Sequence, residues 1–145
     1  MSEHIAKVKW QRQGPFSHEG FERAHEALIS GHTLPMAGAN TQGYADPEQT
    51  LAASLSSCHM QTFLVLASKK RFHVESYEDT AIARLDKNDE GKQYVKEIEL
   101  SPRAVFSGDK QPTAEEIEKM HHKAHAFCFV NNSLISDVIV NPIIE

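Results

Sequence analysis

The sequence predicts a single α+β domain over residues 1–145. Three observations lead to this class. Residues 46–71 read as one long helix, residues 73–86 and 94–106 read as two long strands, and no repeat, low-complexity tract or linker separates these segments. Because 40% of the 145 residues are hydrophobic and 24% are charged, the chain has the composition of one globular domain with a core.

The first third of the chain predicts one strand and leaves one segment ambiguous. Residues 4–10 carry apolar side chains among alanine and lysine and predict an opening strand. Residues 16–33 fit a helix about as well as a pair of strands broken at Ser30 and Gly31, so both alternatives stay open. Residues 35–46 are rich in turn formers and predict a loop.

The segment after this loop predicts the central helix of the fold. Asp46 suits the N-cap, Pro47 the first helical position, and Glu48 the positive end of the helix dipole. The helix is expected to run to about residue 71, with apolar residues around most of its circumference and therefore buried on nearly all sides. One stripe along it consists of Leu51, Leu55, Cys58, Thr62 and Val65.

The two long strands are expected to form one antiparallel ribbon. Residues 87–91, which join residues 73–86 to residues 94–106, contain Asn, Asp and Gly and suit a hairpin turn.

The C-terminal part predicts a second helix and a closing strand. Thr113 followed by two glutamates is typical of a helix start, and apolar residues at helical spacing continue to about Phe127. Residues 131–136 are turn-like or a short helical piece, and residues 138–144 read as a strand.

Charge and hydropathy exclude some classes of partner. A formal net charge of -5 and a pI of about 6.0 argue against a nucleic-acid-binding surface, which is normally basic. The sequence contains no run of 18 apolar residues, and its N-terminus lacks the pattern of a signal peptide. We therefore expect a cytoplasmic protein that binds neither nucleic acid nor membrane.

The two cysteines, Cys58 and Cys128, carry the candidate chemistry. Cys58 lies midway along the central helix, where a thiol is either an inert core residue or, with a neighbour that favours the thiolate, a reactive one. Cys128 lies between two phenylalanines at the end of the second helix, a position that suits either packing or a thiol that moves to close a disulfide. From the residues alone, both interpretations of each cysteine stay open.

Glu48 precedes Cys58 by ten residues, which places the two about 15 Å apart along one helix. They cannot touch on that helix. Either Glu48 only stabilises the helix start, or another segment or a second subunit brings the two residues into one site, which would indicate a homodimer.

The histidines of the second helix offer a possible metal pattern. His121, His125 and Cys128 fall on one helical face with a spacing that can chelate zinc or copper. Histidines near a helix C-terminus are also ordinary because they interact favourably with the dipole. We expect no metal and no cofactor here, and neither these histidines nor His59 and His122 receive a role.

The stretch from Asp46 to Met60 resembles the signature of the OsmC/Ohr family, in which Pro-Glu opens a central helix and the reactive cysteine follows the glutamate by ten residues. Cys128, followed by Asn132, Ser133 and a final strand, sits where that family keeps its second thiol. The resemblance therefore covers the chain from about residue 46 onward.

The resemblance implies an intertwined α+β homodimer, with two central buried helices wrapped by antiparallel sheets and with active sites at the subunit interface. It also implies a cysteine-based peroxidase without a cofactor. Cys58 would attack a hydroperoxide and become a sulfenic acid, Cys128 would condense with it to a disulfide, and a lipoyl protein or small thiol would reduce the disulfide.

In such a site an arginine from the N-terminal segment stabilises the thiolate and a glutamate holds that arginine. Glu48 matches the glutamate. Arg23 is our choice for the arginine, and Arg12 is the alternative.

The sequence departs from the organic-hydroperoxide-resistance branch in its N-terminal half and at Phe129 and Val130, which replace a proline-containing turn. It is more similar to the broader OsmC-like group, and its substrate range is correspondingly open. Apolar residues around Cys58 favour organic hydroperoxides over hydrogen peroxide. Two alternatives to a peroxidase remain at this point, an apolar small-molecule binding protein and a thiol redox sensor.

Overall fold

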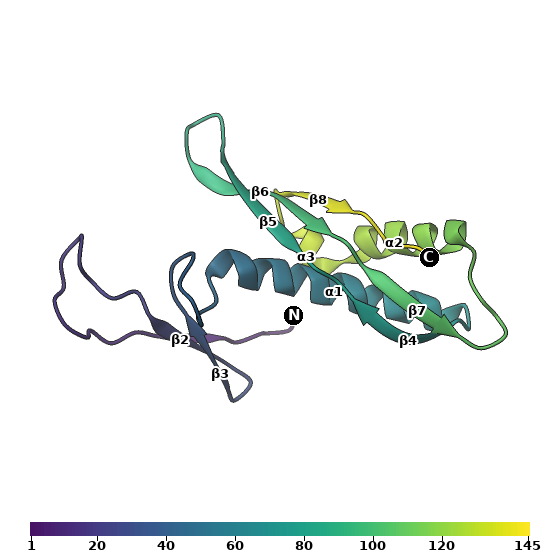
Figure 1. Ribbon diagram of the computed structural model, residues 1–145, viewed down its shortest axis with the longest axis horizontal. Coiled ribbons are helices and arrows are strands. Elements are labelled where there is room, and N and C mark those ends of the chain that lie inside the picture. Colours follow the sequence, from purple (N-terminus) through teal and green to yellow (C-terminus); the bar gives the residue numbers. More distant parts are fainter. The chain divides into compact units, whose positions relative to one another are not determined.

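The computed structural model describes all 145 residues and confirms the α+β class (Figure 1). The chain forms two compact units, residues 1–50 and residues 51–145. Helix α1 (Pro47–Lys69) begins in the first unit and continues in the second.

The first unit is a three-stranded antiparallel sheet in the order β1 (Lys7–Lys9), β2 (His25–Ile29) and β3 (His32–Met36). The opening strand is confirmed, although it is shorter than residues 4–10. The ambiguous segment forms strands, not a helix. Ser30 and Gly31 have φ values of 49° and 79°, and two successive positive φ values are what a tight hairpin turn requires.

Helix α1 begins at Pro47 as the sequence predicts. The Asp46 carboxylate accepts a hydrogen bond from the Gln49 N–H at 2.8 Å, and the Gln49 side chain accepts one from the Asp46 N–H at 2.9 Å. This reciprocal pair satisfies two backbone donors at the helix start and fixes where α1 begins.

Helix α1 is buried along one stripe only, so the expectation of burial on nearly all sides is wrong for the single chain. The buried residues are Ala52, Leu55, His59, Phe63 and Ala67. On another side Ser57 and Gln61 are exposed, and Val65 is 51% exposed. Leu51, Leu64 and Leu66 of α1 are half-buried against the same clusters, whereas the side of α1 that carries Ser57, Gln61 and Val65 stays uncovered within one chain.

The second unit contains two sheets where a single ribbon was expected. Strand β4 (His73–Glu78) pairs with β7 (Arg103–Ser107), and β5 (Ile82–Lys87) pairs with β6 (Gln93–Leu100). The antiparallel pairing is confirmed, but the ribbon is interrupted.

The interruption has a physical cause at Asp79 and Pro102. The Asp79 carboxylate accepts hydrogen bonds from the Ser101 N–H at 2.6 Å and from the Ser56 hydroxyl, in place of ladder hydrogen bonds. Pro102 has no N–H to donate to a strand neighbour. These two residues therefore divide the ribbon.

The C-terminal elements complete the second unit. Helix α2 (Ala114–Phe127) starts with the capping box of Thr113 and Glu116 and runs antiparallel alongside α1 (Figure 1). A short helix α3 (Phe129–Asn132) follows directly, so the helical piece lies earlier than residues 131–136. Strand β8 (Asp137–Val140) is shorter than residues 138–144 and pairs in parallel with β6.

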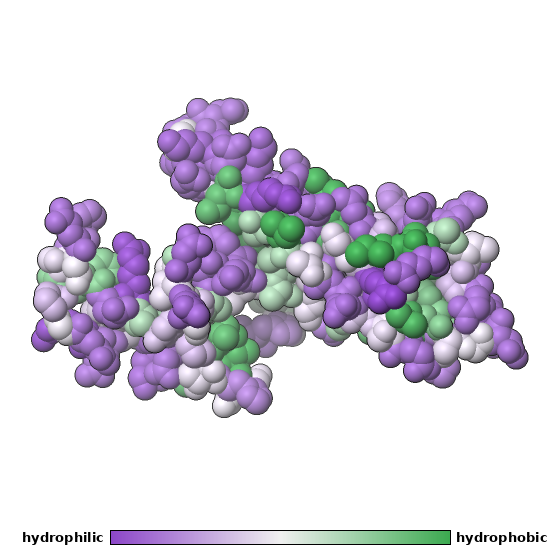
Figure 2. Space-filling view, in the orientation of Figure 1, coloured by the Kyte–Doolittle hydropathy of each residue, from purple (hydrophilic) through white to green (hydrophobic).

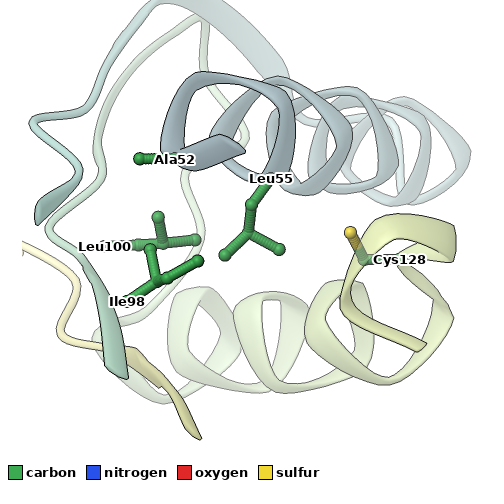
Figure 3. Packing of buried hydrophobic residues seen from close by; sticks show 5 residues of the cluster. All are labelled: Ala52, Leu55, Ile98, Leu100 and Cys128. Atoms are coloured by element: carbon green, nitrogen blue, oxygen red, sulfur yellow. The ribbon is translucent and has the colours of Figure 1, made fainter. Parts of the chain in front are cut away.

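Two buried clusters hold α1 to the other elements of the second unit. One joins α1, β6 and the end of α2, and it consists of Ala52, Leu55, Ile98, Leu100 and Cys128 (Figure 3). The other lies further along α1 and consists of Phe63, Ala67, Phe72, Met120 and Ala124. Figure 3 shows the side chains of Leu55, Ile98 and Leu100 directed toward one another.

The surface mixes hydrophilic areas with separate hydrophobic patches (Figure 2). Several large apolar side chains are exposed, including Phe127 at 58%, Phe129 at 81% and Ile135 at 87%. None of the helices combines the length and the apolarity that a membrane span would need.

Candidate active site

Cys58 lies in the middle of α1 and is half-buried at the edge of the cluster that contains Cys128. The preceding Ser57 is exposed and the following His59 is buried. Cys58 therefore lies at the boundary between the solvent-exposed side and the buried side of α1. A thiol in this position is accessible to a substrate, and neighbouring residues can change its pKa.

Cys128 lies at the junction of α2 and α3, where it is the C-cap of the first helix and the N-cap of the second. Its side chain is fully buried, and its sulfur accepts a hydrogen bond from the Asn131 N–H at 3.4 Å. Figure 3 shows this sulfur directed toward α1, the helix that carries Cys58.

The surroundings of the two thiols separate their pKa values. Burial alone raises the pKa of Cys58, but hydrogen bonds from the Val130 N–H, the Cys128 thiol and the Phe129 N–H outweigh burial and lower that pKa below its ordinary value of 9.0. Burial raises the pKa of Cys128 to about 11, and the neighbouring Cys58 adds to the increase. The pair therefore favours a thiolate on Cys58 and keeps the proton on Cys128.

The N–H groups that act on Cys58 belong to the first turn of α3. The first residues of a helix carry backbone N–H groups without an intrahelical partner, and Phe129 and Val130 occupy these positions. The junction of α2 and α3 at Cys128 thus brings a thiol and two N–H donors to the Cys58 sulfur.

Glu48 occupies the first turn of α1, as the sequence predicts, and is half-buried. None of the ion pairs of the chain involves Glu48, Arg23 or Arg12. The chain therefore brings the two cysteines together but does not pair the glutamate with either candidate arginine.

The two candidate arginines have different surroundings within the first unit. Arg23 holds its guanidinium 4.9 Å from the centre of the Phe21 ring and borders an apolar pocket of about 540 Å³. The other residues that line this pocket are Val8, Trp10, Phe16, Phe21, His25, Ala37, Gly38 and Pro47. Arg12 instead donates a hydrogen bond to the nearby Gly14 carbonyl. Of the two, only Arg23 lines this pocket.

His59 and His121, for which no role is predicted from the sequence, form a buried contact between α1 and α2. His59 Nε2 and His121 Nδ1 are 3.0 Å apart, within hydrogen-bonding distance. One signal was available in the sequence. His59 falls on the same helical stripe as Leu55 and Phe63, which predicts that it is buried.

The histidine spacing on α2 does not assemble a metal site within the chain. His121 lies against α1, His122 is exposed, and no group of three or more His, Cys, Asp or Glu side chains is arranged to hold a metal ion.

An α+β fold in which a central helix presents one thiol to a second thiol at the end of another helix defines a class of dithiol proteins. Within it, this chain belongs to the OsmC-like protein family, which its residues 39–142 match. No curated protein matches the sequence.

Solved structures support the same assignment. An OsmC-like protein of unknown function from Vibrio cholerae is 40% identical, with a TM-score of 0.95 over 99% of this chain and 100% of that chain. The organic hydroperoxide resistance protein OhrB of Bacillus subtilis is 19% identical, with a TM-score of 0.69 over 96% of this chain and 98% of that chain. A hypothetical protein from Aquifex aeolicus is 15% identical, with a TM-score of 0.73 over 100% of this chain and 98% of that chain. The last two show the shared fold.

Proposed function

We propose that this protein is a cysteine-based peroxidase that reduces organic hydroperoxides. The observation that carries the proposal is the contact between Cys58, whose thiol pKa is lowered, and Cys128, whose thiol pKa is raised. A thiolate is the nucleophilic form of cysteine, so Cys58 is the thiol suited to react first, and the neighbouring Cys128 supplies the second sulfur, which loses its proton in the second step.

The reaction balances with these two residues and one external dithiol. The Cys58 thiolate attacks the distal peroxide oxygen, the O–O bond breaks, and the alkoxide takes up a proton from solvent to leave as the alcohol. The Cys58 sulfenic acid then condenses with the Cys128 thiol, which loses its proton, and water departs as the disulfide forms. A dithiol such as dihydrolipoamide reduces the disulfide by two electrons and restores both thiols.

Glu48 and Arg23 enter this proposal through a homodimer. Glu48 and Cys58 lie on one helix, too far apart to share a site within one subunit. We therefore assign Cys58 and Cys128 to one subunit and Arg23 and Glu48 to its partner, where the guanidinium would stabilise the thiolate. Glu48 and Arg23 are not paired in the single chain, so Glu48 would orient the arginine only once the second subunit completes the site. The exposed apolar Val65 of α1 and Phe129 of α3 support an interface with a second copy.

Mixing two inactive variants tests this arrangement. Subunits with Cys58→Ser and subunits with Arg23→Ala are refolded together in equal amounts. Half of the dimers are then hybrids with one intact site of two, so about one quarter of the wild-type activity is expected to return. Light scattering measures the dimer in parallel. A monomer, or a mixture as inactive as its components, would contradict the shared site.

The substrate preference follows from the residues around Cys58. Leu51, Val130 and Leu134 are partly buried members of the same cluster and would provide apolar contacts to an alkyl group. We expect cumene hydroperoxide to be consumed faster than hydrogen peroxide, with dihydrolipoamide as reductant. Equal or faster consumption of hydrogen peroxide would refute the preference, and no consumption of either would refute the peroxidase.

The pocket beside Arg23 supports a second candidate, a binding protein for apolar ligands. Its walls are mainly aromatic and aliphatic, with one guanidinium that suits an acidic group on the ligand. Fatty-acid binding that survives Cys58→Ser, in a protein without hydroperoxide turnover, would favour this candidate.

A further inference from the structure

The buried histidine pair of α1 and α2 lies beside the thiol pair. His59 and His121 are 1% and 2% exposed, and their hydrogen bond links the two helices. The His121 ring also stacks on the Phe63 ring at a centroid distance of 4.1 Å. Two residues of α1, His59 and Phe63, therefore hold the His121 ring.

The histidine pair and the cysteine pair link the same two helices, since α1 carries His59 and Cys58, and α2 with its C-cap carries His121 and Cys128. His59 directly follows Cys58 on α1, and His121 precedes Cys128 by seven residues, which is about two helical turns. Any shift of α2 along or around α1 would change both contacts together. The contact between the imidazoles and the contact between the thiols therefore depend on the same placement of α2 against α1.

This polar contact is costly to bury. His121 Nε2 is buried and has no hydrogen-bond partner, and the same is true of His125 Nδ1. A buried polar atom without a partner destabilises the folded state, and two apolar side chains of similar size are often at least as stable as a buried polar pair. Stability alone therefore does not explain two imidazoles at this position.

A hydrogen bond differs from an apolar contact in the geometry that it requires. It weakens steeply when the angle or distance changes, whereas apolar side chains can slide and repack with little loss. A buried polar pair can therefore fix one arrangement of two helices where an apolar pair would allow several.

We propose that His59 and His121 are positioning residues that hold α2 in one register against α1, so that Cys128 stays within reach of Cys58. This inference deepens the proposed function and rests on it, because the register matters in the step in which Cys128 closes the disulfide. Neither histidine needs to contact the hydroperoxide for this role.

The test measures the dithiol–disulfide equilibrium of the purified protein in glutathione redox buffers, without any hydroperoxide. His121→Leu keeps an apolar side chain of similar size but removes the hydrogen bond, and it is expected to lower the equilibrium constant for the Cys58–Cys128 disulfide about tenfold. His121→Asn places an amide near the position of Nδ1 and is expected to restore most of this loss. His122→Leu, on the exposed side of α2, is the matched control and is expected to change nothing.

Alkylation of Cys58 by iodoacetamide separates positioning from general damage. We expect its rate to fall in His121→Leu and to recover in His121→Asn, because the Cys128 thiol and the N–H groups of Val130 and Phe129, which lower the Cys58 pKa, directly follow α2 and move with it. If His121→Leu does not fold, the double variant His59→Leu and His121→Leu replaces it, since neither imidazole is then left unpaired. An unchanged disulfide equilibrium in the folded single or double variant would overturn the inference.

Different results would refute the proposed peroxidase activity and the proposed positioning role of His59 and His121. A wild-type protein that closes the disulfide in glutathione buffer but consumes no hydroperoxide would refute the peroxidase and leave the positioning role in place. A protein that consumes hydroperoxide, and whose disulfide equilibrium is the same with or without the histidine pair, would refute the positioning role alone.

Discussion

Replacing Cys58 by serine is expected to lower hydroperoxide consumption by a factor of about 10³ or more, because a hydroxyl remains protonated where the thiol forms a thiolate. The measurement is the loss of cumene hydroperoxide with excess dihydrolipoamide. Ser57→Ala, at the neighbouring exposed position of α1, is the control and is expected to keep the wild-type rate.

Cys128→Ser is expected to behave differently from Cys58→Ser. The Cys58 thiolate can still attack one equivalent of hydroperoxide, but the sulfenic acid then has no protein thiol with which to condense. A sulfenic-acid reagent such as dimedone should therefore label this variant and not Cys58→Ser. Wild-type turnover in Cys58→Ser, or failure to trap a sulfenic acid in Cys128→Ser, would contradict the roles assigned to the two cysteines.

The buried histidine pair is expected to make the fold sensitive to acid. Burial, with a smaller contribution from His125, lowers the pKa of His59 from 6.5 to about 4, and Asp79 only partly opposes the shift. Burial, with a contribution from His59, lowers the pKa of His121 from 6.5 to about 3. His125 on α2, Asp79 after β4 and Tyr77 of β4 are the titratable groups that face the pair.

The direction of this pH dependence follows from the number of protons that the folded and the unfolded states bind. Below its ordinary pKa of 6.5 each histidine binds a proton in the unfolded chain, whereas in the folded protein both stay neutral until the pH approaches their lowered pKa values. The free energy of unfolding is therefore expected to fall as the pH drops from about 7 to about 4, by a loss on the order of 3 kcal/mol for His59.

Urea unfolding over this pH range measures the loss. The double variant His59→Leu and His121→Leu should lose much of the dependence, and the carboxylates that both proteins share cancel in the comparison. His122→Asn, on the exposed side of α2, should keep it. A double variant with the same slope as wild type would show that other groups cause the acid sensitivity.

The fold could be predicted from the sequence where local signals decide the structure. Asp46 and Pro47 set the start of α1, and Thr113 with Glu116 sets the start of α2, because capping depends only on neighbouring residues. The division of the ribbon was not predicted. It depends on Asp79 reaching Ser56 and Ser101, which lie 23 and 22 positions away in the chain.

Only part of the candidate site could be predicted, because some of its contacts join residues that are far apart in the chain. The family resemblance named Cys58 and Cys128 as a pair, and the structure brings them together. The residues that lower the pKa of Cys58 include Val130 and Phe129, which act through backbone N–H groups that no side-chain pattern reveals. The partner of His59 lies 62 positions away, so no local spacing could have indicated it.

The parallel pairing of β8 with β6 has a consequence for the nascent chain. Leu100 of β6 and Val140 of β8 are paired neighbours, and Ile98 and Leu100 line the cluster around Cys128. Because β8 follows both cysteines along the chain, the ribosome adds it only after Cys58 and Cys128 have been made. Until residues 137–140 have emerged, Val138 and Val140 do not cover the cluster around the two thiols. Both thiols are therefore more accessible to oxidants in the nascent chain than in the folded protein.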